Sequence, residues 1–407
     1  MFQRTLEQAI YLINKTFPVL LLTGPRQVGK TTLLDMCAGE GRQYVTLDDL
    51  QQRELARTDP TLFLQTHGTP LTIDEVQYAP ELFSAIKLVV DKEKRNGLYW
   101  LTGSQKFHLM QGISESLAGR VAVLDLLGLS LAEIEGRVDK AAAFVPTPEW
   151  IAQARQHASI PLTVAAVFDR IWRGSFPKLN QDPEISRDIF YKSYIETYIQ
   201  RDVRDIIKIT DDLSFNKFVR ACAARTGQLL NFSDLSRDAD IDHKTAKSWL
   251  GVLETSGLVY MLFPYHSNVT KRLVKTPKLY FLDTGLCAYL TRWPNATSLE
   301  AGAMAGAILE TWLIGEMLKS YWHHGAAAHF YFYRDQDQQE IDLLIETGDA
   351  LLPVEFKKTA SPARNAPKHF HVLNKLGKPT GHGAVICFVE KDVPLSNEVT
   401  AVPVGYL

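Results

Sequence analysis

A short segment near the N-terminus, Gly24 to Thr32 (GPRQVGKTT), constrains the fold more than any other part of the chain. It follows an apolar run, Phe17 to Leu22, that is typical of a buried strand, and it precedes Leu33 to Met36, where a helix is expected to begin. A glycine, four residues and then Gly-Lys-Thr is the complete spacing of a phosphate-binding loop. Glycines let backbone N–H groups close around phosphate oxygens, and the helix N-terminus adds partial positive charge. A plain glycine-containing turn is the less favoured interpretation.

The loop predicts a site for ATP and Mg²⁺. Lys30 is expected to reach the β- and γ-phosphates, and the Thr31 hydroxyl is expected to bind Mg²⁺. The residues expected to bind the nucleotide are Gly24, Pro25, Arg26, Gln27, Val28, Gly29, Lys30, Thr31 and Thr32.

Two acidic residues end the next clear strand, Leu71-Thr-Ile-Asp74-Glu75. In a phosphate-binding-loop enzyme, Asp74 would hold the metal through water, and Glu75 would polarise the attacking water. Acidic residues at the end of a strand are common and by themselves are weak evidence of a site. Because they follow a complete phosphate-binding loop, however, this pair is a strong second indication of a nucleotide site.

A third apolar strand, starting at Leu98, ends in Thr102-Gly-Ser104. In this architecture that strand lies between the other two, so Ser104 or Thr102 is expected to orient the lytic water. Further on, Arg120 in SLAGR either stabilises transition-state charge from a neighbouring subunit or is a solvated surface residue. Three apolar strands separated by helical stretches predict a parallel sheet with helices on both faces and the nucleotide at the strand C-termini.

The motifs GPRQVGKTT, LTIDE, LTGSQ and SLAGR, in this order, resemble the bacterial and archaeal AAA-type ATPases that carry a restriction-endonuclease-like C-terminal domain. The resemblance implies Asp74 and Glu75 as the acidic pair, Ser104 as the sensor and Arg120 as an arginine finger. It also implies a homo-oligomer, because a finger that acts in trans needs a neighbouring subunit.

Composition sets the remaining bounds. A chain of 407 residues with 46% apolar content is long enough for two or three globular domains. A net charge of −2 means that any contact with DNA or RNA must be a local patch. The four scattered cysteines indicate ordinary thiols in a reducing, cytoplasmic compartment, and no apolar run is long enough for a membrane span.

The middle of the chain predicts a winged-helix domain. Three helical stretches, Ser214 to Thr226, Asn231 to Arg237 and Asp242 to Glu254, precede a strand from Leu258 to Pro264. A basic hairpin then follows, with Lys271, Arg272, Lys275 and Lys278. The third helix and this wing would contact DNA, or the domain would bind protein or act as a spacer; the sequence leaves both open.

Four residues of the C-terminal part, Glu310, Asp342, Glu355 and Lys357, have the chemistry of a catalytic site. Glu355 and Lys357 project from one face of a strand, and a hairpin partner brings Asp342 beside them. Asp342 and Glu355 are the expected ligands of Mg²⁺ or Mn²⁺, and the lysine would orient the water that attacks a phosphodiester. This is the D…ExK arrangement of restriction-endonuclease-like folds. A catalytically silent fold that binds a partner is the alternative.

The expected fold class is α/β, with an AAA-type ATP-binding domain (1–138), a linker and helical segment (139–212), a winged-helix domain (213–300) and a nuclease-like α/β domain (301–407). The first hypothesis is an ATPase that couples its nucleotide state to a nucleic-acid-directed, metal-dependent C-terminal domain. The second is a nucleotide-gated scaffold whose C-terminal domain binds protein or nucleic acid and cuts nothing.

Overall fold

The computed structural model describes residues 1–407 except 104–108, 110–112, 114, 158–160, 199–211 and 268–274. The chain forms two compact units. The first unit contains Met1–Leu129 together with two short later segments, Thr255–Gly257 and Trp322–Ala326. The second unit contains Ser130–Glu254, Leu258–Tyr321 and Ala327–Leu407.

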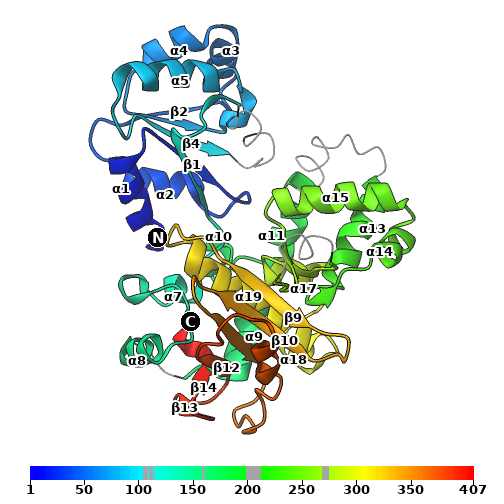
Figure 1. Cartoon of the computed structure of the whole chain (residues 1–407). Coiled ribbons are helices and arrows are strands. Elements are labelled where there is room, and N and C mark those ends of the chain that lie inside the picture. Colours follow the sequence, from blue (N-terminus) through cyan, green and yellow to red (C-terminus); the bar gives the residue numbers. More distant parts are fainter. Residues whose placement is uncertain (104–108, 110–112, 114, 158–160, 199–211, 268–274) are drawn as a thin grey trace. The chain divides into compact units, whose positions relative to one another are not determined.

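The first unit is built on a parallel five-stranded sheet with the order β2-β3-β4-β1-β5 (Figure 1). Its strands are β1 (Val19–Thr23), β2 (Gln43–Thr46), β3 (Leu71–Asp74), β4 (Tyr99–Gly103) and β5 (Val121–Asp125). The parallel sheet is confirmed, and β4 lies between β3 and β1 as expected. The two strands that the sequence did not predict, β2 and β5, are the edge strands and are only partly buried, so their apolar signal is weak.

Helices of the first unit connect these strands. They are α1 (Glu7–Thr16), α2 (Lys30–Cys37), α3 (Leu50–Thr58), α4 (Pro60–His67) and α5 (Leu82–Glu93), with the 3-10 helix η1 (Val76–Tyr78). The core places strand residues such as Leu21, Ile73 and Leu101 against Phe83 and Ile86 of α5, all of them buried. Each such side chain contributes about 1.5–3 kcal/mol when it is removed from water. A rigid sheet therefore fixes the strand ends where the predicted nucleotide residues lie.

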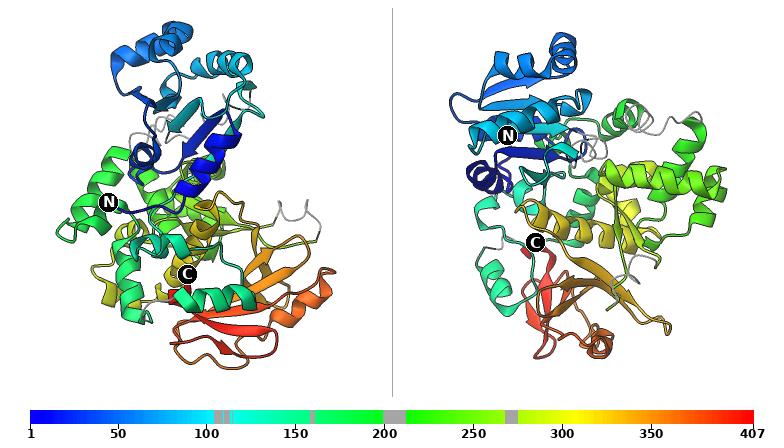
Figure 2. Two further views of the ribbon diagram at one scale, coloured as in Figure 1. Left: turned by 90° about the vertical axis from the view of Figure 1, so that its left-hand side faces the viewer. Right: turned by 45° about the horizontal axis from the view of Figure 1, so that its top comes forward.

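The second unit contains a six-stranded mixed sheet with the order β13-β14-β12-β11-β10-β9, drawn from gold to red in Figure 2. Its strands are β9 (Phe330–Arg334), β10 (Glu340–Glu346), β11 (Leu351–Phe356), β12 (Gly383–Cys387), β13 (Val393–Pro394) and β14 (Val399–Pro403). Strand β10 is antiparallel to both of its neighbours, β9 and β11, whereas β11, β12 and β14 run parallel to one another. Every residue of β11 is buried, which is typical of a strand covered on both faces.

A three-stranded antiparallel sheet with the order β6-β8-β7 and three helices make up another part of this unit. They are α13 (Asp212–Ala223), β6 (Gln228–Leu229), α14 (Phe232–Ala239), α15 (His243–Thr255), β7 (Val259–Leu262) and β8 (Lys278–Phe281). Asn231 caps α14, and the Asp242 carboxylate accepts hydrogen bonds from the N–H groups of Lys244 and Thr245 at 2.8 and 3.0 Å. The tip of the expected basic hairpin, with Lys271 and Arg272, lies outside the described residues.

The remaining helices lie in the second unit. They are α7 (Leu131–Ile134), η2 (Val138–Lys140), α8 (Pro148–His157), α9 (Val164–Arg173), α10 (Pro177–Gln181), α11 (Arg187–Tyr194), α17 (Thr284–Leu290), α18 (Ala296–Ala301), α19 (Ala305–Trp322), η4 (Phe370–Lys375) and η5 (Val404–Tyr406). None of the described helices has the length and hydropathy that a membrane crossing requires.

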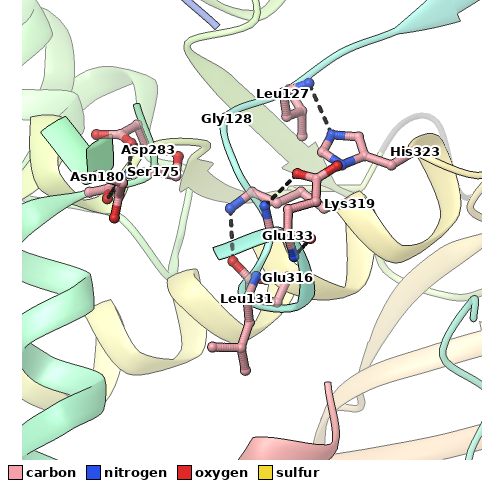
Figure 3. A network of polar contacts seen from close by, with 12 residues as sticks. Leu127, Gly128, Leu131, Glu133, Ser175, Asn180, Asp283, Glu316, Lys319 and His323 are labelled. Atoms are coloured by element: carbon pink, nitrogen blue, oxygen red, sulfur yellow. Dashed lines mark hydrogen bonds and ion pairs between the residues drawn. The ribbon is translucent and has the colours of Figure 1, made fainter. Parts of the chain in front are cut away.

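Buried polar contacts attach α7 to α19 (Figure 3). The Leu131 N–H, at the start of α7, donates to Glu316 Oε2 at 2.7 Å, and Lys319 Nζ donates to Glu316 Oε1 at 2.8 Å. Ser130 and Glu133 form a capping box on the same short helix. Because the charges are paired and hydrogen-bonded, their burial is tolerated.

Candidate functional site

The phosphate-binding loop lies between β1 and α2 and depends on glycine at both ends. Gly24 has a φ of 143°, and a Cβ at this position would collide with the Leu126 carbonyl oxygen. Gly29, the residue before α2, has a φ of 92° in the left-handed region that glycine adopts without strain. The loop backbone therefore depends on glycine at both ends, because another residue would be strained at either position.

Lys30 is buried beneath this loop. Its Nζ donates hydrogen bonds to the carbonyl oxygens of Gly24 and Pro25, both at 2.9 Å. Burial lowers the pKa of Lys30 to about 8, and this effect is opposed by the nearby carboxylates of Glu75 and Asp74. The ammonium is held inside the loop, where a phosphate would exchange for the backbone carbonyls.

Asp74, the last residue of β3, is the centre of the polar contacts at this sheet edge. Its Oδ2 accepts hydrogen bonds from Thr31 Oγ1 at 3.0 Å and from the Tyr44 hydroxyl at 2.9 Å. Its Oδ1 accepts from Thr102 Oγ1 and from the Glu75 N–H. The carboxylate of Asp74 and the hydroxyl of Thr31 are hard oxygen donors placed together, and such donors fit Mg²⁺.

Glu75 follows Asp74 in a left-handed conformation, with a φ of 55°. Its Oε2 accepts a hydrogen bond from Gln77 Nε2, and its N–H lies 3.4 Å from Thr102 Oγ1. A non-glycine residue in this conformation carries strain that is often found at functional positions. The contacts orient the Glu75 carboxylate beside the loop, while Ser104, the expected sensor, lies outside the described residues.

Arg120, the expected finger, is paired within its own chain. Its Nε and Nη2 donate to the two carboxylate oxygens of Asp91, on α5, at 2.6 and 3.0 Å. Both side chains are accessible to solvent. A role in a neighbouring subunit would require this pair to open.

The second unit brings the other four predicted residues together. Strands β10 and β11 pair antiparallel with Leu343 opposite Val354, so the register places Asp342 opposite Glu355. The Phe356 N–H donates to Asp342 Oδ2 at 2.9 Å, and Lys357 Nζ donates to Glu355 Oε1 at 2.6 Å. The register of β10 against β9 shifts between Ile341 and Leu344, a stretch that includes Asp342, and such bulges can redirect side chains next to functional sites. We call Glu310, Glu340, Asp342 and Glu355 the acid cluster.

Three residues that the sequence did not assign to this site complete it. Lys278 Nζ lies 2.9 Å from Glu310 Oε1 and 2.6 Å from Glu340 Oε1. The Tyr280 hydroxyl donates to the same Glu310 oxygen at 2.6 Å. Lys278 and Tyr280 both come from β8. The sequence assigned Lys278 to the basic hairpin and gave Tyr280 no role, and their spacing of two on one strand was the available signal.

Burial and mutual repulsion raise the pKa values of these carboxylates. Burial, followed by the charge of Asp342, raises the pKa of Glu310 to about 7 and that of Glu355 to about 7. Burial also raises the pKa of Asp342. For Lys278, burial acts to lower the pKa, but Glu310, Asp342 and Glu340 raise it overall. Perturbed titrating groups of this kind mark candidate functional sites.

No three His, Cys, Asp or Glu side chains among the described residues are arranged to hold a metal ion together. At the acid cluster, lysine ammonium groups contact Glu310 and Glu355 instead. The expected metal ligands Asp342 and Glu355 are thus adjacent, but in this arrangement they are not a formed metal site.

A cavity of about 410 Å³ also lies in the second unit, and Arg334 in its lining pairs with Glu340 of the acid cluster at 3.3 Å. It is lined by two tyrosines, two cationic side chains and other mostly polar residues: Tyr265, His266, Ser267, Lys275, Tyr333, Arg334, Asp335, Gln336 and Leu376. Its volume is within the range of small-molecule sites.

Comparisons with known proteins agree with the geometry of the first unit. Residues 16–135 match the family model of an AAA domain. Residues 165–297 and 305–407 match the models of two domains of unknown function, DUF8612 and DUF4143. The N-terminal part of the chain is therefore an AAA-type domain with a phosphate-binding loop.

Two proteins and several solved structures are also similar to this chain. Uncharacterized proteins of Mycobacterium tuberculosis and Mycobacterium bovis are each 29% identical over 393 residues, which is 95% of this chain and 80% of theirs. A Walker-type ATPase of Pyrococcus abyssi matches with a TM-score of 0.42 and 15% identity, over 70% of this chain and 94% of that one. The RuvB Holliday junction branch migration motor of Thermotoga maritima matches with a TM-score of 0.30 and 15% identity, over 63% and 88% of the two chains.

Proposed function

We propose that this protein binds and hydrolyses ATP at the loop between β1 and α2. The observation that carries the proposal is the contact of Thr31 Oγ1 with Asp74 Oδ2 at 3.0 Å, directly beside the buried Lys30. This contact joins the end of the phosphate-binding loop to the acidic end of β3, which is the pairing that nucleotide hydrolysis requires.

Each residue has a distinct part in the proposed reaction. Backbone N–H groups of the loop and the Lys30 ammonium bind the phosphates, and Thr31 and Asp74 hold Mg²⁺. The metal, when bound, neutralises charge on the phosphate oxygens. Glu75 accepts a hydrogen bond from the attacking water and orients it, and Thr102 fixes the position of Asp74 through its hydroxyl.

The test compares Glu75→Gln with Lys30→Ala. Glu75→Gln keeps the shape of the side chain and loses the base, so we expect ATP to bind while hydrolysis falls by about 10²–10⁴-fold. Lys30→Ala is expected to lose nucleotide binding itself. Glu54→Gln, which changes an exposed acid in the same unit, is the matched control. Hydrolysis that continues unchanged in Lys30→Ala would refute the proposal.

The second candidate function is that the second unit acts on nucleic acid. The cavity with Tyr265, Tyr333, Lys275 and Arg334 in its lining favours it, because aromatic rings stack on bases and cationic groups bind phosphates. The acid cluster, with Lys357 beside Glu355, would supply metal-dependent cleavage of a phosphodiester. The nucleotide-gated scaffold is the alternative, in which the same unit binds and does not cut.

Two measurements separate these candidates. Changing Lys271, Arg272 and Lys275 together to alanine is expected to weaken DNA binding and reduce its salt dependence. The control changes Lys92, Lys94 and Arg95 together to alanine, because this removes the same number of positive charges. Cleavage of plasmid or single-stranded DNA with Mn²⁺ is expected to disappear in Asp342→Ala and to persist in Asp349→Ala, at an exposed turn. DNA binding without any cleavage would select the scaffold.

The proposal that the protein forms a homo-oligomer depends on Arg120 acting at the nucleotide site of a neighbouring subunit. If it does, a mixture of Lys30→Ala and Arg120→Ala proteins regains part of the hydrolysis that each has lost, because one mixed interface combines an intact loop with an intact finger. No recovery in the mixture, together with full activity of Arg120→Ala alone, would assign Arg120 to its surface pair with Asp91.

A further inference from the structure

Gln77 lies in η1, directly after the acidic end of β3, and the reaction proposed above gives it no part. Its Nε2 donates a hydrogen bond to Glu75 Oε2. Within the described part of the chain, Glu75 Oε1 accepts no hydrogen bond. A donor on one oxygen of a carboxylate limits the rotation of the side chain and leaves the other oxygen available to a further partner.

The Gln77 carboxamide packs against the end of β4. A Cβ at Gly103, the last residue of this strand, would lie 2.4 Å from Gln77 Oε1 and 2.6 Å from Leu109 Cδ1. Any side chain at position 103 would therefore occupy the space that the carboxamide fills. Because Gly103 has no side chain, Gln77 can turn back toward Glu75.

The oxygen of this carboxamide shows what fixes its orientation. Gln77 Oε1 is buried, and within the described residues it has no hydrogen-bond partner. A buried carbonyl oxygen without a partner is unfavourable. Exchanging the two ends of the carboxamide would place this oxygen against the Glu75 carboxylate, where two acceptors repel each other. The hydrogen bond to Glu75 therefore outweighs the cost of the unpartnered oxygen.

Other contacts hold the backbone of Glu75 rather than its carboxylate. The Glu75 N–H lies 3.1 Å from Asp74 Oδ1 and 3.4 Å from Thr102 Oγ1. The carboxylate is close enough to Lys30 for its charge to oppose the effect of burial on the pKa of that lysine. It therefore lies beside the place of the phosphates, and in the part of the chain that the structure describes, Gln77 is the residue that donates to it.

We propose that Gln77 is the positioning residue for Glu75 in ATP hydrolysis. Gln77 holds Oε2 of the carboxylate, so that Oε1 accepts the hydrogen bond of the attacking water in a fixed direction. Gln77 itself contacts neither the water nor the nucleotide, and hydrolysis depends on it whereas nucleotide binding does not. This inference rests on the proposed ATPase function and adds to it a residue that nucleotide binding does not need.

The effect on the rate follows from geometry. A water that is held in line, about 3–3.5 Å from the phosphorus, reacts much faster than one that samples many positions. Without the contact from Gln77, the Glu75 side chain turns among its staggered rotamers, and only some of them direct the water toward the phosphate. The loop and Lys30, which bind the phosphates, are unaffected by this rotation.

The test measures ATP affinity by calorimetric titration and hydrolysis at steady state for Gln77→Met in the full chain. Methionine has nearly the length of glutamine and lacks the N–H donors. We expect kcat to fall at least about tenfold, which corresponds to about 1.4 kcal/mol of activation free energy. ATP affinity and KM are expected to stay within about twofold of the wild type. Gln65→Met, at an exposed position on α4, is the matched control and should behave as the wild type.

A Glu75→Gln background separates positioning from a general structural role. Because this background has no carboxylate to direct, Gln77→Met should lower kcat no further there, as single-turnover hydrolysis of radiolabelled ATP measures. A distorted sheet would instead slow both backgrounds equally. An equal effect in the two backgrounds would overturn the inference, and so would a kcat of Gln77→Met that is unchanged or higher than that of the wild type.

A second variant, Gly103→Ala, tests the inference without changing Gln77 and serves if Gln77→Met does not fold. Its Cβ would take the place of the carboxamide, so we expect a similar loss of kcat at unchanged ATP affinity. Gly39→Ala, where a Cβ meets nothing within 4 Å, is the control. Wild-type hydrolysis by Gly103→Ala would count against a role of Gln77. A wild-type protein that does not hydrolyse ATP would refute the proposed function, whereas normal hydrolysis by Gln77→Met would refute this inference alone.

Discussion

Lys30 is the residue whose protonation should control nucleotide binding. Burial lowers its pKa to about 8, so below this pH the ammonium is already charged when ATP binds. Above it, binding must also take up a proton, because phosphate favours the charged lysine. We expect the affinity for ATP to fall as the pH rises from 8 to 9, by up to about tenfold.

Isothermal titration at several pH values measures this dependence. The terminal phosphate of ATP is fully ionised above about pH 7.5, so its own titration does not contribute. Titrations in two buffers of different ionisation enthalpy should show proton uptake at pH 8.5 and little at pH 7. Affinity that stays constant up to pH 9 would mean that Lys30 keeps an ordinary pKa.

At the same scale, single residues show which parts of the site were predictable. The roles predicted for Lys30, Thr31 and Asp74 stay predictions that rest on motif spacing, but the structure does place Thr31 in contact with Asp74. Tyr44 was not predicted, because its contact with Asp74 depends on β2 pairing with β3, and no local pattern marks it. A residue that acts through a neighbouring strand is recognised only when the pairing is known.

Among the elements, the loop before α2 has the strictest backbone requirement. Gly24→Ala should destabilise the loop, because the φ of 143° is unfavourable for alanine and the added Cβ would collide with the Leu126 carbonyl oxygen. We expect a loss of about 3 kcal/mol in the free energy of unfolding and loss of ATP binding. Gly39→Ala, where a Cβ meets nothing within 4 Å, is the control in the same unit. Denaturant unfolding and nucleotide titration check both, and normal ATP binding by Gly24→Ala would contradict the expectation.

Three elements of the second unit meet at Asp283 (Figure 3). Its Oδ2 accepts from the N–H and hydroxyl of Ser175 at 2.7 and 2.8 Å. Its Oδ1 accepts from the Tyr191 hydroxyl at 2.8 Å and the Leu286 N–H at 2.7 Å. One carboxylate therefore connects the turn after α9 with α11 and with the start of α17.

Asp283→Asn is expected to weaken these connections strongly. The amide replaces one accepting oxygen with an NH₂ donor, so the two hydrogen bonds to that oxygen are lost and their donors face the NH₂ group. We expect the free energy of unfolding to fall by about 3–5 kcal/mol. Asp188→Asn is the control, because this exposed acid on α11 pairs only with the adjacent Arg187 in the described contacts, and we expect a change within about 0.5 kcal/mol. Urea unfolding followed by circular dichroism measures both, and equal stabilities would show that the network contributes little.

At the scale of elements, prediction from sequence succeeded where the pattern was local. The antiparallel pairing of β10 and β11 follows from two apolar runs around a Gly-Asp turn, and it places Asp342 beside Glu355. The contact of β8 with α19 did not follow, because Lys278 and Glu310 lie in segments that the sequence assigned to different domains. Charge pairing across such a distance in sequence leaves no periodic signal.

For the whole molecule, the first unit is completed by segments from far along the chain. His323 Nε2 accepts a hydrogen bond from the Leu127 N–H at 3.2 Å, and Gly257 lies against Pro25 of the phosphate-binding loop. Both segments belong to the first unit, although one begins at the last residue of α15 and the other at the last residue of α19. A prediction that divides the sequence into consecutive domains cannot place such later segments in the first unit.

From the contact of Gly257 with Pro25 we expect nucleotide binding to depend on the residues that follow α15. Gly257 has a φ of 70°, and a Cβ there would lie 3.0 Å from Pro25 Cγ and Cδ. We therefore expect Gly257→Ala to weaken ATP binding by about three- to tenfold, through roughly 1 kcal/mol of strain passed to the loop. Gly251→Ala, inside α15 and with nothing within 4 Å of its Cβ, should leave the affinity unchanged. Titration of the two variants with ATP at pH 7 decides the matter: if both bind as the wild type does, the loop is independent of this segment. If only Gly257→Ala is weakened, the segment that follows α15 is part of the nucleotide site.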